Sequence, residues 1–372
     1  MAAPNKTDTC TKKIAIFMPS LRGGGTERIM LTLAEGFTGR GYSVDLVLAA
    51  AEGPYLSLVP ENVRVVDLGA SRMITALPKL AGYLRRERPA SMLSAMNHVN
   101  VVAVWARMLS GARTRLVISE RNHLSLSIET SGSIRLRLLT RFMRMAYPRA
   151  DCIVSVSRGV SQDLAKTLGL SDDNIKVIYN PVVTPDLIES SQHPLDHPWF
   201  APEEPPVILG CGRLCPQKNF SLLIRAFADL RKKRRARLMI LGEGELRENL
   251  EAIIRELGME HDISLPGFVS NPYAYMSKSS LFVLSSNWEG LPGVLVQAMA
   301  CGSPVISTDC PSGPAEILEN GKWGRLVPPN DAGALSGAMA EALDEPSYPD
   351  VTKRAGDFAA DRAIQSYLDT LL

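Results

Sequence analysis

Residues 281–308, LFVLSSNWEGLPGVLVQAMACGSPVIST, contain the repeating unit that decides the fold. LFVLSS is short and almost wholly apolar, which is typical of a strand buried on both faces of a parallel sheet. NWEGLPG indicates a turn, VLVQAMACG a helix that ends at Gly302, and PVIST the next strand. The stretch therefore predicts a strand–turn–helix–strand unit with a polar turn at the carboxyl end of its first strand.

The same alternation extends in both directions from this stretch. Strand-like apolar segments occur in the first half at 13–19, 43–49, 63–68, 91–95, 115–120, 151–157 and 176–180. They occur in the second half at 207–212, 237–242, 263–267, 281–286, 304–308 and 324–328. Amphipathic segments such as NFSLLIRAFADL (219–230) separate several of them. We predict an α/β protein with two Rossmann-like, doubly wound β/α domains that face each other across a cleft.

Composition along the chain predicts the limits of these domains. Residues 181–206 contain seven prolines and little periodicity, which indicates a connecting segment. We therefore predict an N-terminal domain at 1–185, a linker at 186–206 and a second domain at 207–345. The remaining residues, 346–372, include FAADRAIQSYLDTLL, which predicts a last helix that packs back toward the first domain.

Charge and cysteine content exclude several classes of protein. The 372 residues carry 41 Lys and Arg against 39 Asp and Glu, a net charge of +2, so no overall field favours a nucleic-acid partner. The start lacks the apolar region of a signal peptide, and no segment reaches the about 18 apolar residues of a membrane helix. The six cysteines lack Cys-x-x-Cys spacing, which favours reduced core residues over a metal site. We predict a cytoplasmic protein; peripheral contact with the inner face of the cytoplasmic membrane stays open.

The stretch GCGRLCPQKNFSLLI (210–224) places Arg213 and Lys218 in a loop between a strand and a helix. Free N–H groups at a helix start, together with two cations, suit a diphosphate. Solvated loop charges are the alternative on this stretch alone. In LGEGELRENL (241–250), Gly244 would let a ligand approach the backbone, although a plain strand-to-helix turn fits as well because the full dinucleotide fingerprint is absent.

The turn in the opening stretch has the groups that a sugar ligand needs. Glu289 can accept hydrogen bonds from hydroxyl groups, and Gly290 and Gly293 let backbone N–H groups come close to a ligand. Gln297 lies about one helical turn beyond Gly293 on the same face. The alternative is a carboxylate that pairs with the helix dipole and an amide at the surface.

These residues carry a resemblance that covers roughly 13–345. The C-terminal half, with GRLCPQKNFSLLIRAF (212–227), the segment 265–318 and GRLVPPNDAGAL (324–335), resembles retaining glycosyltransferases of family 4, which have the GT-B fold. The N-terminal half matches the same family in GGGTER (23–28), ISERNH (118–123), ADCIVSVSRGV (150–160) and KVIYNPV (176–182). Several motifs in series are more specific than any single loop.

The resemblance implies a nucleotide-sugar donor on the C-terminal domain, an acceptor on the N-terminal domain, and transfer without a metal or other cofactor. Carried onto this chain, Arg213 and Lys218 would hold the donor diphosphate and Glu289 the donor sugar. Gln297 stands where the family has a second glutamate that binds ribose, and its neutral amide lacks the charge that strengthens such a bond. The other donor-binding candidates are Gly24, Gly25, Gly212, Gly244, Gly290, Leu291, Pro292, Gly293 and Val294.

The N-terminal half supplies the acceptor candidates and one further catalytic candidate. His98 lies just beyond a predicted strand, where related enzymes often have a histidine, and it joins Glu289, Arg213 and Lys218 in the predicted catalytic set. A structural histidine is the alternative. The acceptor-binding candidates are Glu27, Asn97, Glu120, Arg121 and Asn122.

Residues 133–150, SIRLRLLTRFMRMAYPRA, form the most asymmetric charge cluster. Arg137, Arg141 and Arg144 share one helical stripe, and the apolar surface is expected from Leu136, Leu139, Phe142 and Met143. A basic amphipathic helix suits an anionic membrane surface, and a core-packed helix with solvated arginines is the alternative. The run RKKRR (231–235) ends a helix, where cations complement the dipole, and contact with a membrane is the alternative.

The predicted function is transfer of a hexose or N-acetylhexosamine, with retention, from a UDP-sugar to a glycan or polyprenyl-diphosphate-linked acceptor in bacterial-type cell-surface polysaccharide synthesis. Because no carboxylate stands out as a nucleophile, we favour attack on the face that the diphosphate leaves. The alternatives are a sugar-nucleotide epimerase or phosphorylase of the same fold, a non-catalytic nucleotide-sugar-binding protein, and a glycosidase, which needs a second carboxylate.

Overall fold

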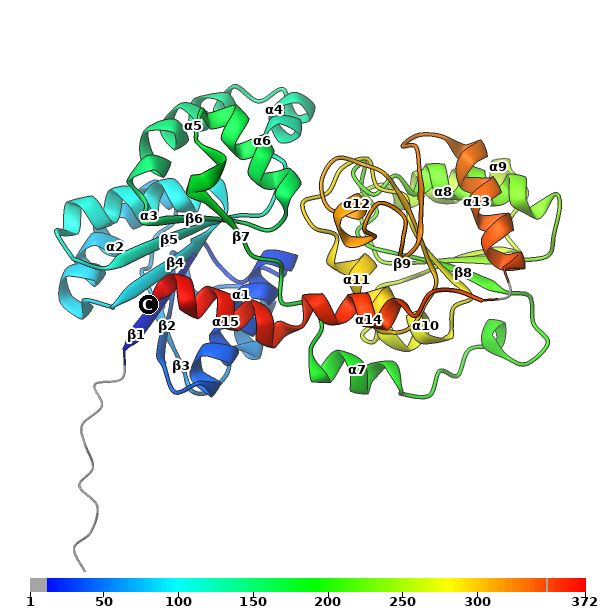
Figure 1. The fold of residues 1–372 in the computed structure, drawn as a ribbon, viewed down its shortest axis with the longest axis horizontal. Coiled ribbons are helices and arrows are strands. Elements are labelled where there is room, and N and C mark those ends of the chain that lie inside the picture. The colour runs from blue at the N-terminus through cyan, green and yellow to red at the C-terminus, as the bar shows by residue number, and fades with distance from the viewer. Residues whose placement is uncertain (1–11, 346) are drawn as a thin grey trace, which may run out of the picture.

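The structure, a computed structural model, describes residues 12–345 and 347–372, and it confirms the predicted pair of Rossmann-like domains (Figure 1). Each domain is a parallel sheet with helices on both faces. In Figure 1 the chain passes from the N-terminal domain on the left to the C-terminal domain on the right, and its last helices return to the left. The start of the chain, on which the absence of a signal peptide was predicted, lies outside the described residues.

The N-terminal sheet has the order β3-β2-β1-β4-β5-β6-β7 in the described part of the chain. Its strands are β1 (Lys13–Met18), β2 (Ser43–Leu48), β3 (Val63–Asp67), β4 (Ser91–Ala95), β5 (Arg115–Glu120), β6 (Cys152–Ser155) and β7 (Ile175–Val177). The α-helices are α1 (Gly25–Gly39), α2 (Met73–Glu87), α3 (Asn97–Ser110), α4 (Leu124–Ser131), α5 (Ile134–Ala146) and α6 (Arg158–Leu168). One buried cluster lies under α2, α3 and α5, and a second lies on the other face under α1.

The C-terminal sheet has the order β10-β9-β8-β11-β12-β13. Its strands are β8 (Val207–Cys211), β9 (Arg237–Leu241), β10 (Ile263–Gly267), β11 (Leu281–Leu284), β12 (Val305–Thr308) and β13 (Arg325–Val327). The α-helices of this half are α8 (Phe220–Arg231), α9 (Arg247–Glu256), α10 (Pro272–Lys278), α11 (Gly293–Ala300), α12 (Pro314–Ile317), α13 (Ala332–Asp344) and α14 (Val351–Ala355). Every predicted strand segment overlaps one of the strands, because a continuous apolar run is what a strand covered on both faces requires. Strand β7 starts at Ile175, one residue before the predicted segment 176–180.

The proline-rich segment predicted as a linker contains structure that the sequence pattern did not reveal. Helix α7 (Pro185–Ser191) starts with Thr184, whose side chain accepts a hydrogen bond from Leu187 N, and has a proline at its first position. Both are helix-start signals. The helix packs against α10 of the C-terminal domain, so the first part of this connection is fixed to that domain.

The last helix, α15 (Ala360–Leu371), packs on the N-terminal sheet although it follows the C-terminal domain in the chain (Figure 1). Tyr367 is fully buried there. Arg115 Nε donates to Thr370 O at 2.8 Å, and Lys176 Nζ donates to Thr370 Oγ1 at 2.8 Å. Gly36 allows α1 and α15 to approach each other closely, since a Cβ on Gly36 would lie 2.3 Å from Ile364 Cδ1. The chain therefore crosses between the domains twice.

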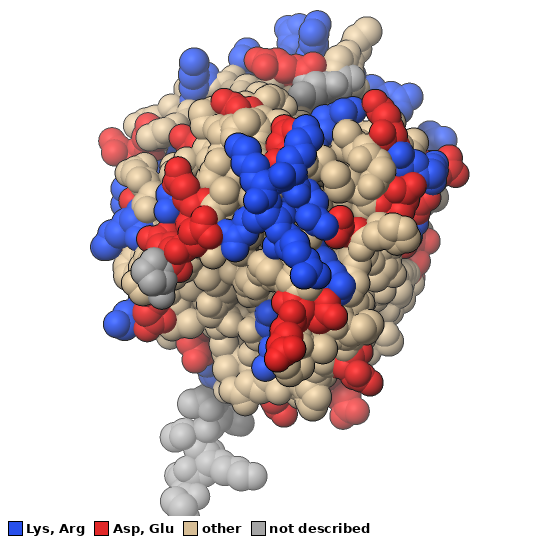
Figure 2. All heavy atoms as spheres, turned by 90° about the vertical axis from the view of Figure 1, so that its right-hand side faces the viewer, with Lys and Arg blue, Asp and Glu red and all other residues tan. Residues whose placement is uncertain are grey.

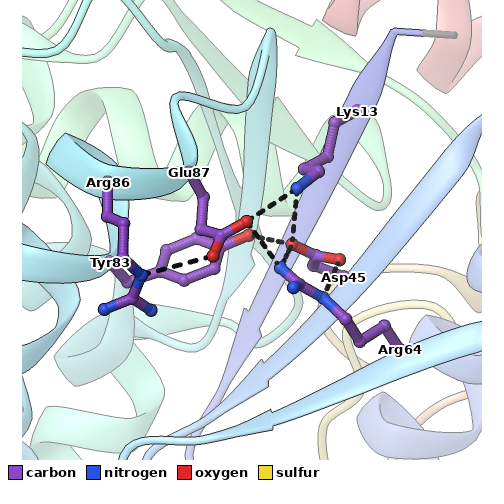
Figure 3. Close-up of polar contacts among 6 residues, drawn as sticks. All are labelled: Lys13, Asp45, Arg64, Tyr83, Arg86 and Glu87. Atoms are coloured by element: carbon purple, nitrogen blue, oxygen red, sulfur yellow. Dashed lines mark hydrogen bonds and ion pairs between the residues drawn. The ribbon is translucent and has the colours of Figure 1, made fainter.

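A charged cluster ties α2 to the amino ends of β1, β2 and β3 (Figure 3). Buried Asp45 accepts hydrogen bonds from Tyr83 OH at 2.6 Å and Arg64 Nε at 2.8 Å. Glu87 bridges Lys13 and Arg64, and these two cations, Lys13 first, lower its pKa to about 2. Because it lies at the amino ends of the strands, this cluster is a structural network remote from the predicted ligand site.

Candidate active site

Most of the predicted site residues lie at two topological switch points; the exceptions are Gly244, which follows β9, and residues 120–122 at the end of β5. In the N-terminal sheet the chain turns from β1 to β2 on one side and returns to β4 on the other; in the C-terminal sheet β8 and β11 have the same relation. Loops diverge at such points and leave a crevice beyond the carboxyl ends of the strands, where ligands bind. Gly24, Gly25 and Glu27 follow β1, and Asn97 and His98 follow β4. Arg213 and Lys218 follow β8, and Glu289 follows β11.

Glu289 and Lys218 form a direct ion pair at the second switch point. Lys218 Nζ lies 2.6 Å from Glu289 Oε1, and both side chains are largely buried. Ser286 Oγ donates to the same oxygen at 2.7 Å. Glu289 Oε2 has only a long contact, 3.5 Å from Gln217 Nε2, among the described residues. One carboxylate oxygen and two of the three ammonium hydrogens are therefore left for a ligand.

The glycines of neighbouring loops bring their backbones into contact. A Cβ on Gly244 would lie 2.4 Å from Leu214 O, and one on Gly242 would lie 2.0 Å from Gly212 O. Leu214 N also donates to Glu243 O at 2.8 Å. Close packing between the loops after β8 and β9 explains these glycines, so their presence needs no ligand.

The remaining donor-binding candidates lie in the loop after β8 and at the start of α11. Arg213 is exposed at the end of β8, and Gln297 is half-buried in α11. Pro292 is the N-cap of α11, Gly293 and Val294 form its first turn, and Leu291 is buried. The N-terminus of α11 therefore starts four residues after Glu289, with its free N–H groups at this end of the sheet.

The first switch point has a strained backbone. Met96, between β4 and α3, has a φ of 78°, which is unusual for a residue with a side chain. Asn97 and His98 follow directly. The side chain of His98 reaches the surface, but the protein around its ring partly desolvates it, and this lowers the pKa of His98. Strained residues cluster at functional sites because the surrounding structure must hold them. On the β1 side, Glu27 folds back over Gly24, where a Cβ would lie 2.4 Å from its Oε2.

Two of the acceptor candidates face into the protein. Glu120 is 3% exposed; Asn100 Nδ2 donates to its Oε1 at 2.9 Å, and Tyr147 OH donates to the same oxygen. Arg121 is 8% exposed and donates to Asn180 Oδ1 at 2.6 Å and Tyr367 OH at 3.2 Å. Asn122, by contrast, is exposed.

Glu120 should make the stability of the fold depend on pH. Burial raises its pKa to about 7, partly offset by its hydrogen bonds with Tyr147 and Asn100 and by the charge of Arg121. Between the unfolded pKa of about 4.3 and this value the folded state holds the extra proton. The contribution of Glu120 to folding is therefore complete below about pH 4.3 and is lost as pH rises through 7. We expect Glu120→Gln to flatten this dependence in urea unfolding at pH 5 and pH 8; equal stability differences from the parent at both pH values would contradict the expectation.

The two domains touch through two residues that the sequence analysis selected, Gly290 and Arg121, and through others that it did not select. Gly290 lies against Arg121, because a Cβ on Gly290 would lie 2.0 Å from Arg121 O. The donor loop, residues 285–292 between β11 and α11, therefore meets residues 120–122 at the end of β5. Ser157 Oγ donates to Gly290 O at 2.8 Å, and Glu316 accepts from Arg158 N at 2.9 Å. Ser157 follows a strand and caps α6, which is a common role of serine. The sequence therefore indicated the helix cap but not the contact with the other domain.

Within 12–345 and 347–372, three or more His, Cys, Asp or Glu side chains do not gather in a way that could hold a metal ion. In the same residues no helix has the length and apolar character needed to cross a membrane.

Two parallel-sheet domains with helices on both faces have the GT-B architecture of glycosyltransferases, and comparison with known proteins agrees. The family Glycosyltransferase Family 4 matches residues 23–185, and Glycosyl transferases group 1 matches residues 193–358. The chain is 32% identical to a Campylobacter jejuni N-acetylgalactosamine-N,N'-diacetylbacillosaminyl-diphospho-undecaprenol 4-alpha-N-acetylgalactosaminyltransferase, over 90% of this chain and 91% of that protein. The chain belongs to this family of family-4-type glycosyltransferases.

Other relatives and solved structures extend the likeness. The lipopolysaccharide core biosynthesis glycosyltransferase LpsE of Rhizobium meliloti is 25% identical over 94% of this chain and 96% of its own. Anabaena HepE in complex with UDP and glucose superposes with a TM-score of 0.76 at 22% identity, covering 97% of this chain and 99% of that one. At that identity the superposition shows a shared fold.

Proposed function

We propose that the protein transfers a hexose or N-acetylhexosamine, with retention of configuration, from a UDP-sugar to a glycan on a polyprenyl-diphosphate carrier in bacterial-type cell-surface polysaccharide synthesis. The observation that carries the proposal is the Lys218–Glu289 pair at the switch point of the second domain. The Campylobacter relative named for a diphospho-undecaprenol substrate supports the acceptor class, and the HepE complexes with UDP support the donor class.

In this mechanism Lys218 and Glu289 bind different parts of the donor. Lys218 and exposed Arg213 bind the diphosphate and stabilise the charge that grows on it as the sugar–phosphate bond breaks. Glu289 Oε2 accepts a hydrogen bond from a hydroxyl group of the donor sugar, and Gln297 contacts the ribose. The acceptor hydroxyl attacks from the face that the diphosphate leaves, and a leaving phosphate oxygen takes its proton. Exposed His98 and Asn122 line the acceptor side.

The burial of Glu120 and Arg121 changes how we assign the acceptor side. Both are bonded to protein groups beneath the strand end, so we propose that they position the loop that contains Asn122. Asn97 stays a candidate for direct contact, because it lies half-buried in the first turn of α3. Glu27 is buried in the first turn of α1, but it stays a candidate because its carboxylate has no hydrogen-bond or ion-pair partner among the described residues.

Turnover with a panel of UDP-, GDP- and ADP-sugars tests the proposal. Release of nucleotide from a UDP-sugar that depends on a polyprenyl-diphosphate glycan, with an axial product linkage from an axial donor, is the expected result. Interconversion of UDP-sugars without an acceptor would favour the epimerase. Binding of nucleotide sugars with no turnover would favour a binding protein.

We further propose that α5 brings the enzyme to the surface of an anionic membrane. Four large apolar side chains form a stripe on this helix with exposed fractions of 44–80%: Ile134, Leu138, Phe142 and Met145. The stripe differs from the predicted one, since Met143 is buried and Leu139 packs on the core. Arg137 and Arg141 are exposed, and no described carboxylate lies within ion-pair distance of either. Apolar groups beside unpaired cations suit anionic headgroups over acyl chains.

The basic run 231–235 provides the matched comparison. Figure 2 looks at the end of the C-terminal domain and shows Lys and Arg gathered in one patch with acidic groups around it. In this run Arg231, Lys232 and Arg234 are paired with Asp262, Asp229 and Asp344. The charge there is largely compensated inside the protein, and the run lacks an apolar stripe.

We expect the double variant Arg137→Glu/Arg141→Glu to bind phosphatidylglycerol vesicles at least about tenfold more weakly, since each basic group near such a surface contributes about 1 kcal/mol. Lys233→Glu/Arg235→Glu makes the same change of charge at the other site and should bind as the parent does. Co-sedimentation with phosphatidylglycerol and phosphatidylcholine vesicles measures both. Equal losses in the two variants would show a mere effect of net charge.

A further inference from the structure

The first turn of α6 contacts the C-terminal domain through a hydrogen bond, a carboxylate and a close backbone approach. Ser157, its fully buried N-cap, accepts a hydrogen bond from Val160 N at 3.2 Å and donates to Gly290 O at 2.8 Å. One hydroxyl group therefore starts the helix and also holds the donor loop of the other domain. Removing it would loosen both at once.

A carboxylate from the C-terminal domain accepts a hydrogen bond from the first N–H group of the same turn. Glu316, in the short helix α12, accepts from Arg158 N at 2.9 Å through Oε2 and from Tyr179 OH at 2.7 Å through Oε1. The first N–H groups of a helix have no partner inside the helix, and the helix dipole favours a negative charge there. Tyr179 also packs on Phe358, with 4.9 Å between ring centroids, at the second crossing of the chain.

Two glycines allow the surfaces to interlock. A Cβ on Gly159 would lie 2.6 Å from Ser312 Oγ and 3.1 Å from Ser312 Cα. Gly290 has the same role from the other side, against the backbone of Arg121. Ser312 has a φ of 65°, so the segment that leads into α12 is shaped to fit this contact.

From these contacts we propose that Ser157, Gly159 and Glu316 form a closure clamp, a set of positioning residues that hold the C-terminal domain against α6. The clamp thereby holds Gly290, the neighbour of Glu289, against Arg121 of the N-terminal domain. The clamp touches no reacting atom. The groups assigned to the donor diphosphate and sugar, Arg213, Lys218 and Glu289, belong to the C-terminal domain and remain assembled when the clamp opens, whereas the donor-binding candidates Gly24 and Gly25 belong to the N-terminal domain. Breaking the clamp should therefore lower kcat and leave donor affinity nearly unchanged. The effect on kcat rests on the proposed transferase activity, whereas closure itself does not.

The variants Glu316→Ala and Glu319→Ala test the clamp with the same chemical change three residues apart. Glu319 pairs with Lys322 and Arg354 inside the C-terminal domain, so it is the control. We expect Glu316→Ala to lower kcat about tenfold or more, the size of one lost hydrogen bond to a charged group, with less than twofold change in UDP affinity. Its small-angle scattering should show a larger maximum dimension. Glu319→Ala should match the parent in both measurements.

The outcomes separate the clamp from the proposed function. Unchanged scattering and unchanged kcat in Glu316→Ala would overturn the clamp, and so would equal changes in both variants. If Glu316→Ala does not fold, Glu316→Gln and Ser157→Ala give the same test with smaller changes. Wild-type protein that binds no UDP would refute the donor assignment, while the scattering comparison of the two variants would still decide closure.

Discussion

Glu289→Gln and Lys218→Ala are each expected to lower turnover by about 10²–10³-fold, the range found when one preorganised group that stabilises transition-state charge is removed. Glu289→Gln keeps the shape of the side chain and the acceptor oxygen but removes the charge that pairs with Lys218 at 2.6 Å. Lys218→Ala removes a cation from the growing charge of the leaving diphosphate. Initial rates of nucleotide release at saturating UDP-sugar measure both effects.

Two further variants separate chemistry from stability. Lys232→Ala removes an exposed lysine that is also paired, with Asp229 at 2.8 Å, and should retain full activity. In the double variant Lys218→Ala/Glu289→Ala no buried charge is left unpaired, so unfolding free energy should recover relative to the single variants while turnover stays low. Recovery of turnover together with stability would show that the pair is structural, and the assignment of the donor site would be wrong.

Arg121→Ala is expected to lower the free energy of unfolding by about 3 kcal/mol, because removing one member of a buried polar network leaves its partners unpaired. Arg121 bridges Asn180 on the crossing segment after β7 and Tyr367 on α15. Its loss should therefore also loosen the last helix from the N-terminal sheet. Denaturant unfolding measures the first effect, and hydrogen exchange of residues 360–371 measures the second.

Arg22→Ala is the control for this variant, since Arg22 is an exposed arginine whose partner Glu52 is also exposed. It should change the unfolding free energy by less than about 1 kcal/mol. A stable Arg121→Ala protein with a raised KM for the acceptor alone would contradict the structural role and return Arg121 to the acceptor-binding set.

The sequence by itself determined the elements of the fold and their type. Apolar runs such as Ile14–Met18 and Leu281–Leu284 have the length and composition of strands covered on both faces, and all their residues are buried. Local signals also gave the turn at Glu289 and the helix that starts at Gly293. Helix α7 was missed because prolines that start a helix and prolines that prevent one look alike in a short polar segment.

Only the tertiary structure decided which strand-end residues are buried and which are exposed. Glu120, Arg121 and Asn122 are consecutive in the sequence, yet the first two are buried against Tyr147 and Tyr367, and the third is exposed. The clamp between α6 and Glu316 joins residues 158 positions apart. Strand periodicity and capping are local properties that short segments carry, whereas burial and contact between domains depend on which distant segments pack together, and no short segment encodes its neighbour.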